Sequence, residues 1–416
     1  MTAQATQHTL QAQQRLELEQ TLNQATENCC TLVILANTQT PYRLHFHRRI
    51  VNEMPEVQLW SLFTHEYDKQ RWKWVEDESI RTRCFGWGES IEAPATLRQR
   101  WRDWRKGGRI VRWMMRHEPD AILVLGYADI GKVRALRWAK RRKIATLMFI
   151  DSNVFGDRAR GWRRIVKRIA LGRILSWCDC LLPCGSAGEA YLRRYGVPDE
   201  RIIRCPYEPD YRMILSLPAS RIASAQERFG LRPGRRRIVY CGRLSSEKRV
   251  DLLLNAFARI RSDRPEWDLV LIGDGPLREH LETAGGCFDG ERVIWTGFVA
   301  DPRDVAAIYR NCDALALPSD YEPWGLVVNE AVAAGLAVIA SDVVGAAREL
   351  VSPGVNGALF EPGNEHALVD SLLRVTDADA IDALKAGSLG VLSDWRTKAD
   401  PVQGLLGALQ RTGRMV

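Results

Sequence analysis

Short apolar runs alternate along the chain with longer segments that have helical spacing. A brief apolar run that ends at polar residues is typical of a strand buried on both faces of a parallel sheet. The pattern therefore predicts an α/β fold in which strands and helices alternate in two successive units. The expected strands are 31–36, 121–125, 144–150 and 180–183 in the first unit, and 237–241, 269–272, 293–295, 314–317 and 337–340 in the second.

The change from one unit to the next falls near residues 210–234, where a turn-like segment precedes the strand expected at 237–241. We expect a polar N-terminal extension at 1–30, a first domain at 31–212 and a second domain at 213–395. The segment 397–411 looks helical, with an interruption at Asp400 and Pro401. A chain of 416 residues is long enough for two domains of this size.

Composition restricts where the protein works. Apolar residues make up 46% of the chain, but the longest apolar stretch, 326–340, contains Asn329 and Glu330, so no transmembrane helix is expected. Residues 1–28 lack the basic start and apolar block of a secretory signal. The ten cysteines have no metal-binding spacing, which indicates free thiols in a reducing cytoplasm.

Charge is distributed unevenly between the two halves. Residues 1–215 carry 36 Lys and Arg against 24 Asp and Glu, and the remainder carries 23 against 27, so the net charges are +12 and −4 and sum to +8. Two Trp-containing basic segments, 98–116 and 158–173, account for much of the excess. They fit either the surface of an anionic membrane or helices packed on their own sheet with an Arg-rich outer face. No nucleic-acid-binding module is recognised, so no nucleic acid is expected as a partner.

Three motifs follow expected strands of the second domain. The segment 242–248 (GRLSSEK) brings Arg243 and Lys248 to the end of a strand, where two cations suit a diphosphate and neutralise charge on a leaving group. Gly273 opens a tight turn after the next strand, and Phe298 with Val299 follows the third. Each of these motifs, taken alone, is also compatible with an ordinary loop.

The fourth motif is more specific. The segment 321–330 (YEPWGLVVNE) places Glu322 in a loop and Glu330 about two turns inside the helix that follows. The helix N-terminus near Gly325 and Leu326 offers free N–H groups and the positive end of a dipole, which is a site for a diphosphate. The two carboxylates can then hold hydroxyl groups on either side of the phosphates.

With these motifs in order, the sequence resembles glycosyltransferase family four, whose members are retaining enzymes with the GT-B fold of two Rossmann-like domains facing across a cleft. The resemblance covers residues 180–365 most clearly. It implies that Glu322 faces the hydroxyls of the donor sugar and Glu330 the ribose of the nucleotide. The catalytic residues that we infer are Glu322, Arg243, Lys248 and Asp151, and the donor-binding residues are Gly242, Arg243, Lys248, Gly273, Phe298, Val299, Gly325, Leu326, Val327 and Glu330.

The first domain departs from this family in two places. Many members have a Gly-rich loop after the first strand, whereas this chain has the segment 37–43 (NTQTPYR), from which we select Tyr42 and Arg43 as acceptor-side candidates. Many members also have a His after a middle strand, and Asp151 stands at the comparable position here. The resemblance also implies that the C-terminal helix, 396–416, returns to the first domain.

The implied reaction moves a sugar from a nucleotide-sugar donor to a hydroxyl of a glycan or lipid-linked acceptor, in cell-surface or extracellular polysaccharide synthesis. In a front-face retaining mechanism the acceptor attacks from the side that the diphosphate leaves, so no protein nucleophile is required. Arg243 and Lys248 take the place of a metal ion, because no Asp-x-Asp motif is suitably placed to bind one. We expect no metal and no cofactor besides the donor substrate. The expected location is the cytoplasm, and peripheral attachment to the cytoplasmic face of the inner membrane stays open.

Two alternative functions stay open. A nucleotide-sugar epimerase shares the two-domain fold, but it would turn over the donor alone, and GT-B epimerases lack this spacing of paired glutamates. A non-catalytic, membrane-associated scaffold could keep the fold, but the intact set of Arg243, Lys248, Glu322 and Glu330 argues against that.

Overall fold

The computed structural model describes residues 29–67, 72, 74–91, 96–157, 159–285 and 292–415. The expected polar extension, apart from its last two residues, therefore lies outside the described residues, as does Cys287. All nine cysteines within the described ranges are free thiols, and seven of them are buried.

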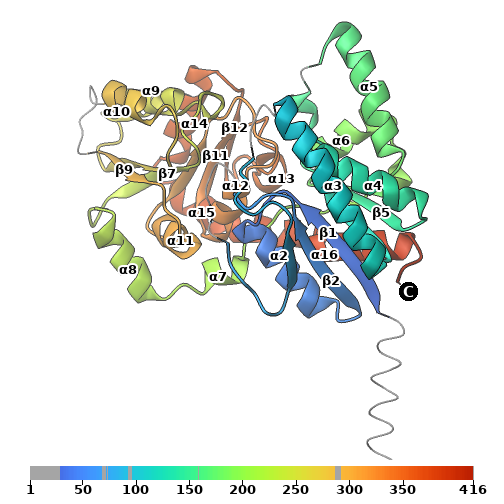
Figure 1. The fold of residues 1–416 in the computed structure, drawn as a ribbon. Helices are drawn as coiled ribbons and strands as arrows, with labels where there is room; N and C mark the ends of the chain where they lie inside the picture. Colours follow the sequence, from blue (N-terminus) through green and yellow to red (C-terminus); the bar gives the residue numbers. More distant parts are fainter. Residues whose placement is uncertain are drawn as a thin grey trace, which may run out of the picture.

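The first domain is built on a six-stranded parallel sheet (Figure 1). Its strands lie in the order β3-β2-β1-β4-β5-β6. This is the order of doubly wound folds, and it reverses between β1 and β4, where the carboxyl ends of the strands flank a natural binding site. The strand bounds are β1 (Cys30–Ala36), β2 (Val57–Phe63), β3 (Arg81–Cys84), β4 (Ala121–Leu125), β5 (Ala145–Ile150) and β6 (Cys180–Pro183).

The second domain repeats this topology. Its strands lie in the order β12-β11-β10-β7-β8-β9, all parallel, so the order reverses between β7 and β10. Two parallel six-stranded sheets with flanking helices confirm the α/β fold of two Rossmann-like domains. The strand bounds are β7 (Arg236–Cys241), β8 (Trp267–Ile272), β9 (Val293–Gly297), β10 (Ala314–Leu317), β11 (Ala337–Ser341) and β12 (Gly357–Phe360).

Helices cover both faces of the first sheet because side chains alternate along its strands. Leu32 and Ile34 of β1 belong to the apolar core that includes α2 and α16, whereas Val33 and Leu35 belong to the core beneath α3 and α4. The helices are α2 (Pro41–Glu53), α3 (Leu97–His117), α4 (Ile130–Arg141), α5 (Gly161–Leu175), α6 (Ser186–Arg194), α7 (Tyr211–Leu215), α8 (Ala219–Arg228), α9 (Val250–Ile260), α10 (Arg278–Gly285), α11 (Pro302–Tyr309), α12 (Leu326–Ala333), α13 (Ala347–Leu350), α14 (Glu365–Val375), α15 (Ile381–Lys398) and α16 (Pro401–Arg411).

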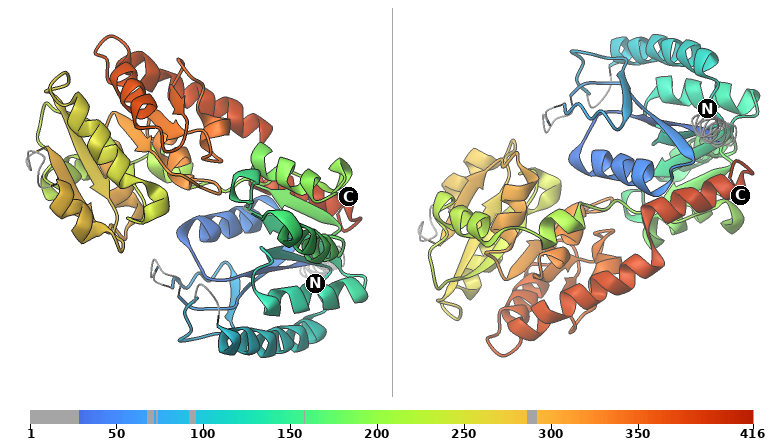
Figure 2. Two further views of the ribbon diagram at one scale, coloured as in Figure 1. Left: turned by 90° about the horizontal axis from the view of Figure 1, so that it is seen from above. Right: turned by 90° about the horizontal axis from the view of Figure 1, so that it is seen from below.

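The chain returns to the first domain at its C-terminal end (Figure 2). Helix α15 ends at Lys398, and α16 begins at Pro401 with the side chain of Asp400 capping its first turn. The thiol of Cys205 donates to the carbonyl of Pro401 at 3.4 Å, and α16 packs against α2 and β6. The interruption in the helical pattern thus marks the crossing between the domains.

Nine strands were expected, and the structure adds β2, β3 and β12. Strand β2 contains Gln58 and Ser61, so its sequence is not a continuous apolar run. Strand β3 lies at the edge of the sheet and has two Arg among its four residues. These strands join the sheet through backbone hydrogen bonds. Backbone hydrogen bonds do not depend on apolar side chains, so the apolar pattern did not predict these strands.

The two basic segments differ in how they pack. Helix α3 has seven buried residues, including Ile110 and Trp113, and its Arg-rich side faces outward. Helix α5 buries only Leu171 and Leu175. For the second segment the packed-helix alternative is therefore wrong, because its apolar stripe faces outward. Among the described residues, no helix combines the length and apolar character needed to cross a bilayer.

Candidate functional site

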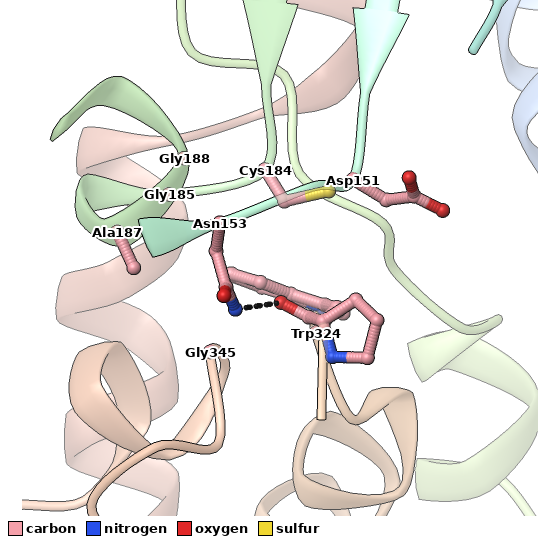
Figure 3. Close-up of a pocket in the computed structure, with 9 residues that line it drawn as sticks. Asp151, Asn153, Cys184, Gly185, Ala187, Gly188, Trp324 and Gly345 are labelled. Carbon is pink, nitrogen blue, oxygen red and sulfur yellow. Dashed lines mark hydrogen bonds between the residues drawn. The ribbon is translucent and has the colours of Figure 1, made fainter. Parts of the chain in front are cut away.

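A pocket lies between the two domains, at the carboxyl ends of strands from both sheets (Figure 3). Asp151 and Asn153 line it from the loop after β5, and Trp324 and Gly345 line it from loops of the second domain. The side-chain amide of Asn153 donates to the carbonyl of Pro323 at 3.0 Å. The first domain is thus bonded directly to the loop that carries Glu322.

Lys248 and Glu322 meet at this edge of the second sheet. Lys248 ends a short 3-10 turn after β7, and Glu322 lies in the loop between β10 and α12. The ammonium of Lys248 donates to the carboxylate of Glu322, and their side chains are 17% and 15% exposed. Two residues that the sequence places 74 positions apart therefore form a partly solvent-accessible ion pair.

Arg243 lies in the same loop after β7 as Lys248. Among the described residues, its guanidinium makes no hydrogen bond or ion pair, although its backbone carbonyl accepts a hydrogen bond from the Tyr240 hydroxyl at 2.9 Å. The backbone beneath it is tightly packed, since a side-chain carbon added at Gly273 would lie 1.9 Å from the carbonyl oxygen of Gly242. Gly273 also has a φ of 135°, which favours glycine. The loops after β7 and β8 can approach this closely only with glycine there.

Helix α12 points its N-terminus toward the same edge. Gly325 precedes it with a φ of 89°, and the N–H of Val328 bonds to the carbonyl of Gly325 at 2.9 Å. The N–H groups of Leu326 and Val327 have no acceptor among the described residues, as is usual in the first turn of a helix. They are therefore available to an anion that also contacts Arg243 or Lys248.

Glu330 lies only a little more than one turn into α12, because the helix begins at Leu326. The expected depth of two turns is therefore wrong. Its carboxylate accepts a hydrogen bond from the Tyr309 hydroxyl at 3.2 Å. Burial raises the pKa of Glu330 to about 7, and the bond from Tyr309 offsets this only in part. Glu330 is therefore poised to change its charge near neutral pH.

Phe298 and Val299 follow β9 at the outer side of the site. Val299 is buried, whereas Phe298 is 46% exposed. The ring of Phe298 meets the ring of Trp72 of the first domain edge-on, with 5.6 Å between centroids. This aromatic contact is a second bridge between the domains.

The acceptor-side candidates gather at the carboxyl edge of the first sheet. Arg43 donates to the carbonyl of Thr38 at 2.8 Å, and the ring of Tyr42 packs edge-on against Tyr207. Burial alone would lower the pKa of Arg43, but the hydroxyls of Tyr42 and Tyr207 raise it above its ordinary value. Asp151 is exposed at the end of β5. These side chains make a charged, aromatic edge, and Asp151 lines the pocket opposite Trp324 of the second domain.

Sequence reasoning missed several residues at this site. Asn153 lies two positions after Asp151, and this polar pair directly after a strand was a usable signal. Lys132 is 1% exposed, donates to the carbonyl of Leu125, and has a pKa lowered to about 8 by burial. Tyr309 supports Glu330 from α11. Nothing in the apolar pattern distinguishes Lys132 or Tyr309 from ordinary helix residues.

One cluster away from the pocket has the composition of a metal site. Ligand atoms of His65, Glu89 and Asp103 lie within 4.8 Å of one another. However, the ammonium of Lys106 lies among them, 2.6 Å from Glu89, 3.4 Å from Asp103 and 3.3 Å from the Nε2 atom of His65. This buried cation already balances the carboxylates, so the cluster is a structural ion network.

With this geometry in view, comparison with known proteins identifies the second domain. Residues 222–384 match the family model of the glycosyl transferases group 1. The second domain is a glycosyl transferases group 1 domain. The matched residues include the loops of Arg243, Lys248, Gly273 and Phe298 and both glutamates of the paired motif.

Individual relatives agree with this assignment. The chain is 31% identical over 170 residues to an uncharacterized glycosyltransferase of Methanocaldococcus jannaschii, covering 40% of this chain and 38% of that protein. It is 32% identical over 231 residues to a GDP-mannose-dependent alpha-(1-6)-phosphatidylinositol dimannoside mannosyltransferase of Mycobacterium tuberculosis, covering 54% and 57%. The chain thus spans 25% to 57% of the length of these curated relatives.

A solved structure matches over almost the whole chain. The Anabaena protein HepE, in complex with UDP and glucose, has a TM-score of 0.69 at 17% identity, with 92% of this chain and 99% of that chain covered. This likeness extends the shared fold to the first domain.

Proposed function

We propose that the protein is a retaining glycosyltransferase that moves a sugar from a nucleotide-sugar donor to an acceptor hydroxyl. The observation that carries the proposal is one arrangement in a glycosyl transferases group 1 domain: the unpaired guanidinium of Arg243, the ammonium of Lys248 and the free N–H groups of α12 share one sheet edge. Cations and helix N–H groups at one place suit a diphosphate.

The two glutamates would hold the parts of the donor on either side of the diphosphate. Glu330 would accept hydrogen bonds from the hydroxyl groups of the ribose. Burial raises its pKa and favours the neutral carboxyl, whereas these hydrogen bonds would favour the ionised form. Glu322 would exchange its bond to Lys248 for hydroxyls of the sugar. Phe298 and Val299 would line the space for the base. Relatives support this class of donor, since one is named as GDP-mannose-dependent and the structure of HepE holds UDP.

In the proposed step the acceptor oxygen attacks the anomeric carbon from the side that the diphosphate leaves. The bond from that carbon to the phosphate oxygen breaks, the bond to the acceptor oxygen forms, and the acceptor proton passes to the leaving phosphate. Arg243 and Lys248 stabilise the negative charge that develops on the phosphate. This route needs no protein nucleophile and no metal ion.

The acceptor would enter from the first domain, beside Tyr42, Arg43 and Asp151. We propose a glycan or a lipid-linked glycan, handled at the cytoplasmic face of the membrane during polysaccharide synthesis. The mycobacterial relative, named a phosphatidylinositol dimannoside mannosyltransferase, supports an acceptor of this class.

The test begins with thermal unfolding of the full chain in a panel of nucleoside diphosphates and their sugars. We expect one nucleotide to raise the melting temperature, and Lys248→Ala and Arg243→Ala to reduce the increase. Arg259→Ala, on α9 and paired with Glu365, is the matched control and should leave the increase unchanged. No increase with any nucleotide would favour the non-catalytic scaffold.

Turnover then separates the remaining functions. A transferase should consume the identified donor only when an acceptor is present, and nuclear magnetic resonance of the product should show the anomeric configuration of the donor. Chelation of divalent ions should leave the rate unchanged. Conversion of the donor alone into another nucleotide sugar would identify an epimerase instead.

A further inference from the structure

Helix α5 carries an apolar stripe that covers nothing in the structure. Trp162, Ile165 and Ile169 are 70%, 63% and 70% exposed, and Val166 beside them is 54% exposed. Positions separated by three and four residues lie on one side of a helix, so these four side chains form a continuous strip. Burying large apolar side chains is favourable, and leaving four of them in water along one helix indicates a partner.

The orientation of α5 is fixed by the opposite side of the helix. The ammonium of Lys167 bonds to Asp157 at 2.9 Å, while Leu171 and Leu175 are buried against the domain. At 100° per residue, Ile165 and Ile169 lie nearly opposite Lys167 and therefore point away from the protein. In Figure 1 the N-terminal part of α5 stands clear of the neighbouring helices.

The charges beside the stripe all have one sign. Helix α5 contains no acidic residue, and its Arg163, Arg164, Arg168 and Arg173 are exposed. A helix with an apolar strip flanked by cations and without acidic residues fits the headgroup region of an anionic bilayer. We infer that α5 binds the surface of an anionic membrane, with its apolar strip in the acyl boundary and its arginines at the lipid phosphates.

Helix α3 is a weaker candidate, although it is also basic. Its exposed Trp101 and Trp104 are each covered by a guanidinium, from Arg105 at 4.7 Å and from Arg134 at 4.4 Å. Its other exposed apolar side chains, Leu97 and Met115, lie at opposite ends of the helix, and Ile110, Trp113 and Met114 are buried in the domain core. The structure thus assigns membrane contact to α5 and leaves α3 as a solvated basic helix.

The place of α5 in the chain relates the membrane to the pocket. The loop that leads from β5 into α5 carries Asp151 and Asn153, and both line the interdomain pocket. A bilayer bound at α5 would therefore lie near the acceptor side of the pocket, where a lipid-linked acceptor could enter without leaving the membrane. This part rests on the proposed glycosyl transfer, whereas membrane binding by α5 does not.

The experiment is flotation of the full chain with vesicles of phosphatidylcholine alone or with added phosphatidylglycerol. We expect binding to the anionic vesicles only, and binding that weakens with salt. Combining Trp162→Ala, Ile165→Ala and Ile169→Ala should weaken the partition coefficient at least about tenfold. Combining Arg163→Gln, Arg164→Gln and Arg168→Gln should weaken it roughly a hundredfold at low salt.

Matched controls keep the test specific. Leu389→Ala removes an exposed leucine (48%) from α15 of the second domain, and Trp101→Ala removes an exposed tryptophan (59%) of α3. Both should float as the unchanged protein does. All variants should keep the melting temperature and its increase with nucleotide, so failure of membrane binding is distinguishable from failure of the donor site.

Three outcomes would overturn the inference. They are equal binding to neutral and anionic vesicles, undiminished binding of the α5 variants, and a fall in molar mass by light scattering when the apolar residues of α5 are replaced. The last would assign the stripe to a second copy of this chain.

Discussion

The ammonium of Lys248 is bonded to the carboxylate of Glu322. The ammonium and the carboxylate therefore bind each other at the position where, in the proposed function, both would bind the donor. A diphosphate must share Lys248 with Glu322, whereas the guanidinium of Arg243 makes no hydrogen bond or ion pair among the described residues. A whole nucleotide sugar can resolve this competition, because its sugar hydroxyls offer Glu322 a new partner as its phosphates take Lys248.

This competition predicts opposite effects of Glu322→Gln on binding and on turnover. The neutral amide releases Lys248, so a nucleoside diphosphate without its sugar should bind several-fold more tightly, while kcat falls because the sugar is no longer held by a carboxylate. Lys248→Ala should instead weaken binding about 10- to 100-fold, which is the range for losing a hydrogen bond to a charged group. Titration calorimetry measures both affinities.

Lys140→Ala is the matched control for that experiment. Lys140 also pairs with a carboxylate, that of Asp179, at 2.5 Å, but it lies on α4 of the first domain. Its replacement should leave nucleotide affinity unchanged. If Glu322→Gln weakened the nucleoside diphosphate as much as Lys248→Ala does, the two residues would act together on the phosphates and the competition would be disproved.

Glu330 predicts a dependence of nucleotide affinity on pH. Its pKa of about 7 means that the ligand-free carboxyl is largely protonated at lower pH, and only the ionised form accepts two hydroxyl hydrogens. Affinity should therefore rise between about pH 6 and about pH 8. In Glu330→Gln this rise should disappear, and comparison in the same buffers removes the titration of the nucleotide's own phosphate.

The same carboxyl predicts a gain in stability when it is neutralised. Glu330 keeps its carboxyl proton in the folded protein up to a pH of about 7, whereas a glutamate in the unfolded chain loses it near pH 4.5. The contribution of Glu330 therefore lowers the free energy of unfolding progressively as the pH rises from about 4.5 to about 7. Glu330→Gln should raise the melting temperature more at about pH 8 than at about pH 5. An equal effect at both values would mean that burial does not raise this pKa.

Much of the architecture was predictable because its strands are continuous apolar runs. Strands such as β4 and β10 are buried on both sides, and their bounds follow directly from the sequence. The second-domain site was also predictable, because Arg243 and Glu322 each follow a strand, and parallel strands bring their carboxyl ends to one edge. The ion pair between Lys248 and Glu322 could not be predicted. Two residues that both bind a ligand do not have to contact each other when the ligand is absent.

The orientation of α5 also could not be predicted from the sequence. Trp162 and Ile169 lie on one helical face whether that face packs inward or points outward, and periodicity is the same in both cases. Only the position of Leu171 and the bond of Lys167 to Asp157 decide between them. The hydrogen bond of Asn153 to Pro323 likewise depends on how the two domains approach each other.

Asn153 is predicted to be a positioning residue for the Glu322 loop. It is 2% exposed, its amide donates to carbonyls of both Glu322 and Pro323, and its carbonyl oxygen accepts from the N–H of Phe155. Asn153→Ala should lower kcat roughly tenfold with a smaller effect on nucleotide affinity, because the second-domain contacts to the nucleotide stay. Ser176→Ala, at an exposed helix end, is a control with no expected effect. An equal loss in kcat and nucleotide affinity would instead indicate a general structural role.

Gly273 gives the most direct test of the backbone at the donor site. An alanine there would place its side-chain carbon 1.9 Å from the carbonyl oxygen of Gly242 and would have to adopt a φ of 135°. The loops after β7 and β8 must then separate, so Gly273→Ala should lower the free energy of unfolding by about 2 kcal/mol or more and weaken nucleotide binding as well. Gly390→Ala is the opposite control: it lies inside α15 with no atom near the added carbon, so it should stabilise the protein by about 0.5–1 kcal/mol. Denaturant unfolding measures both changes, and a Gly273→Ala variant as stable as the unchanged protein would show that these two loops do not depend on their close contact.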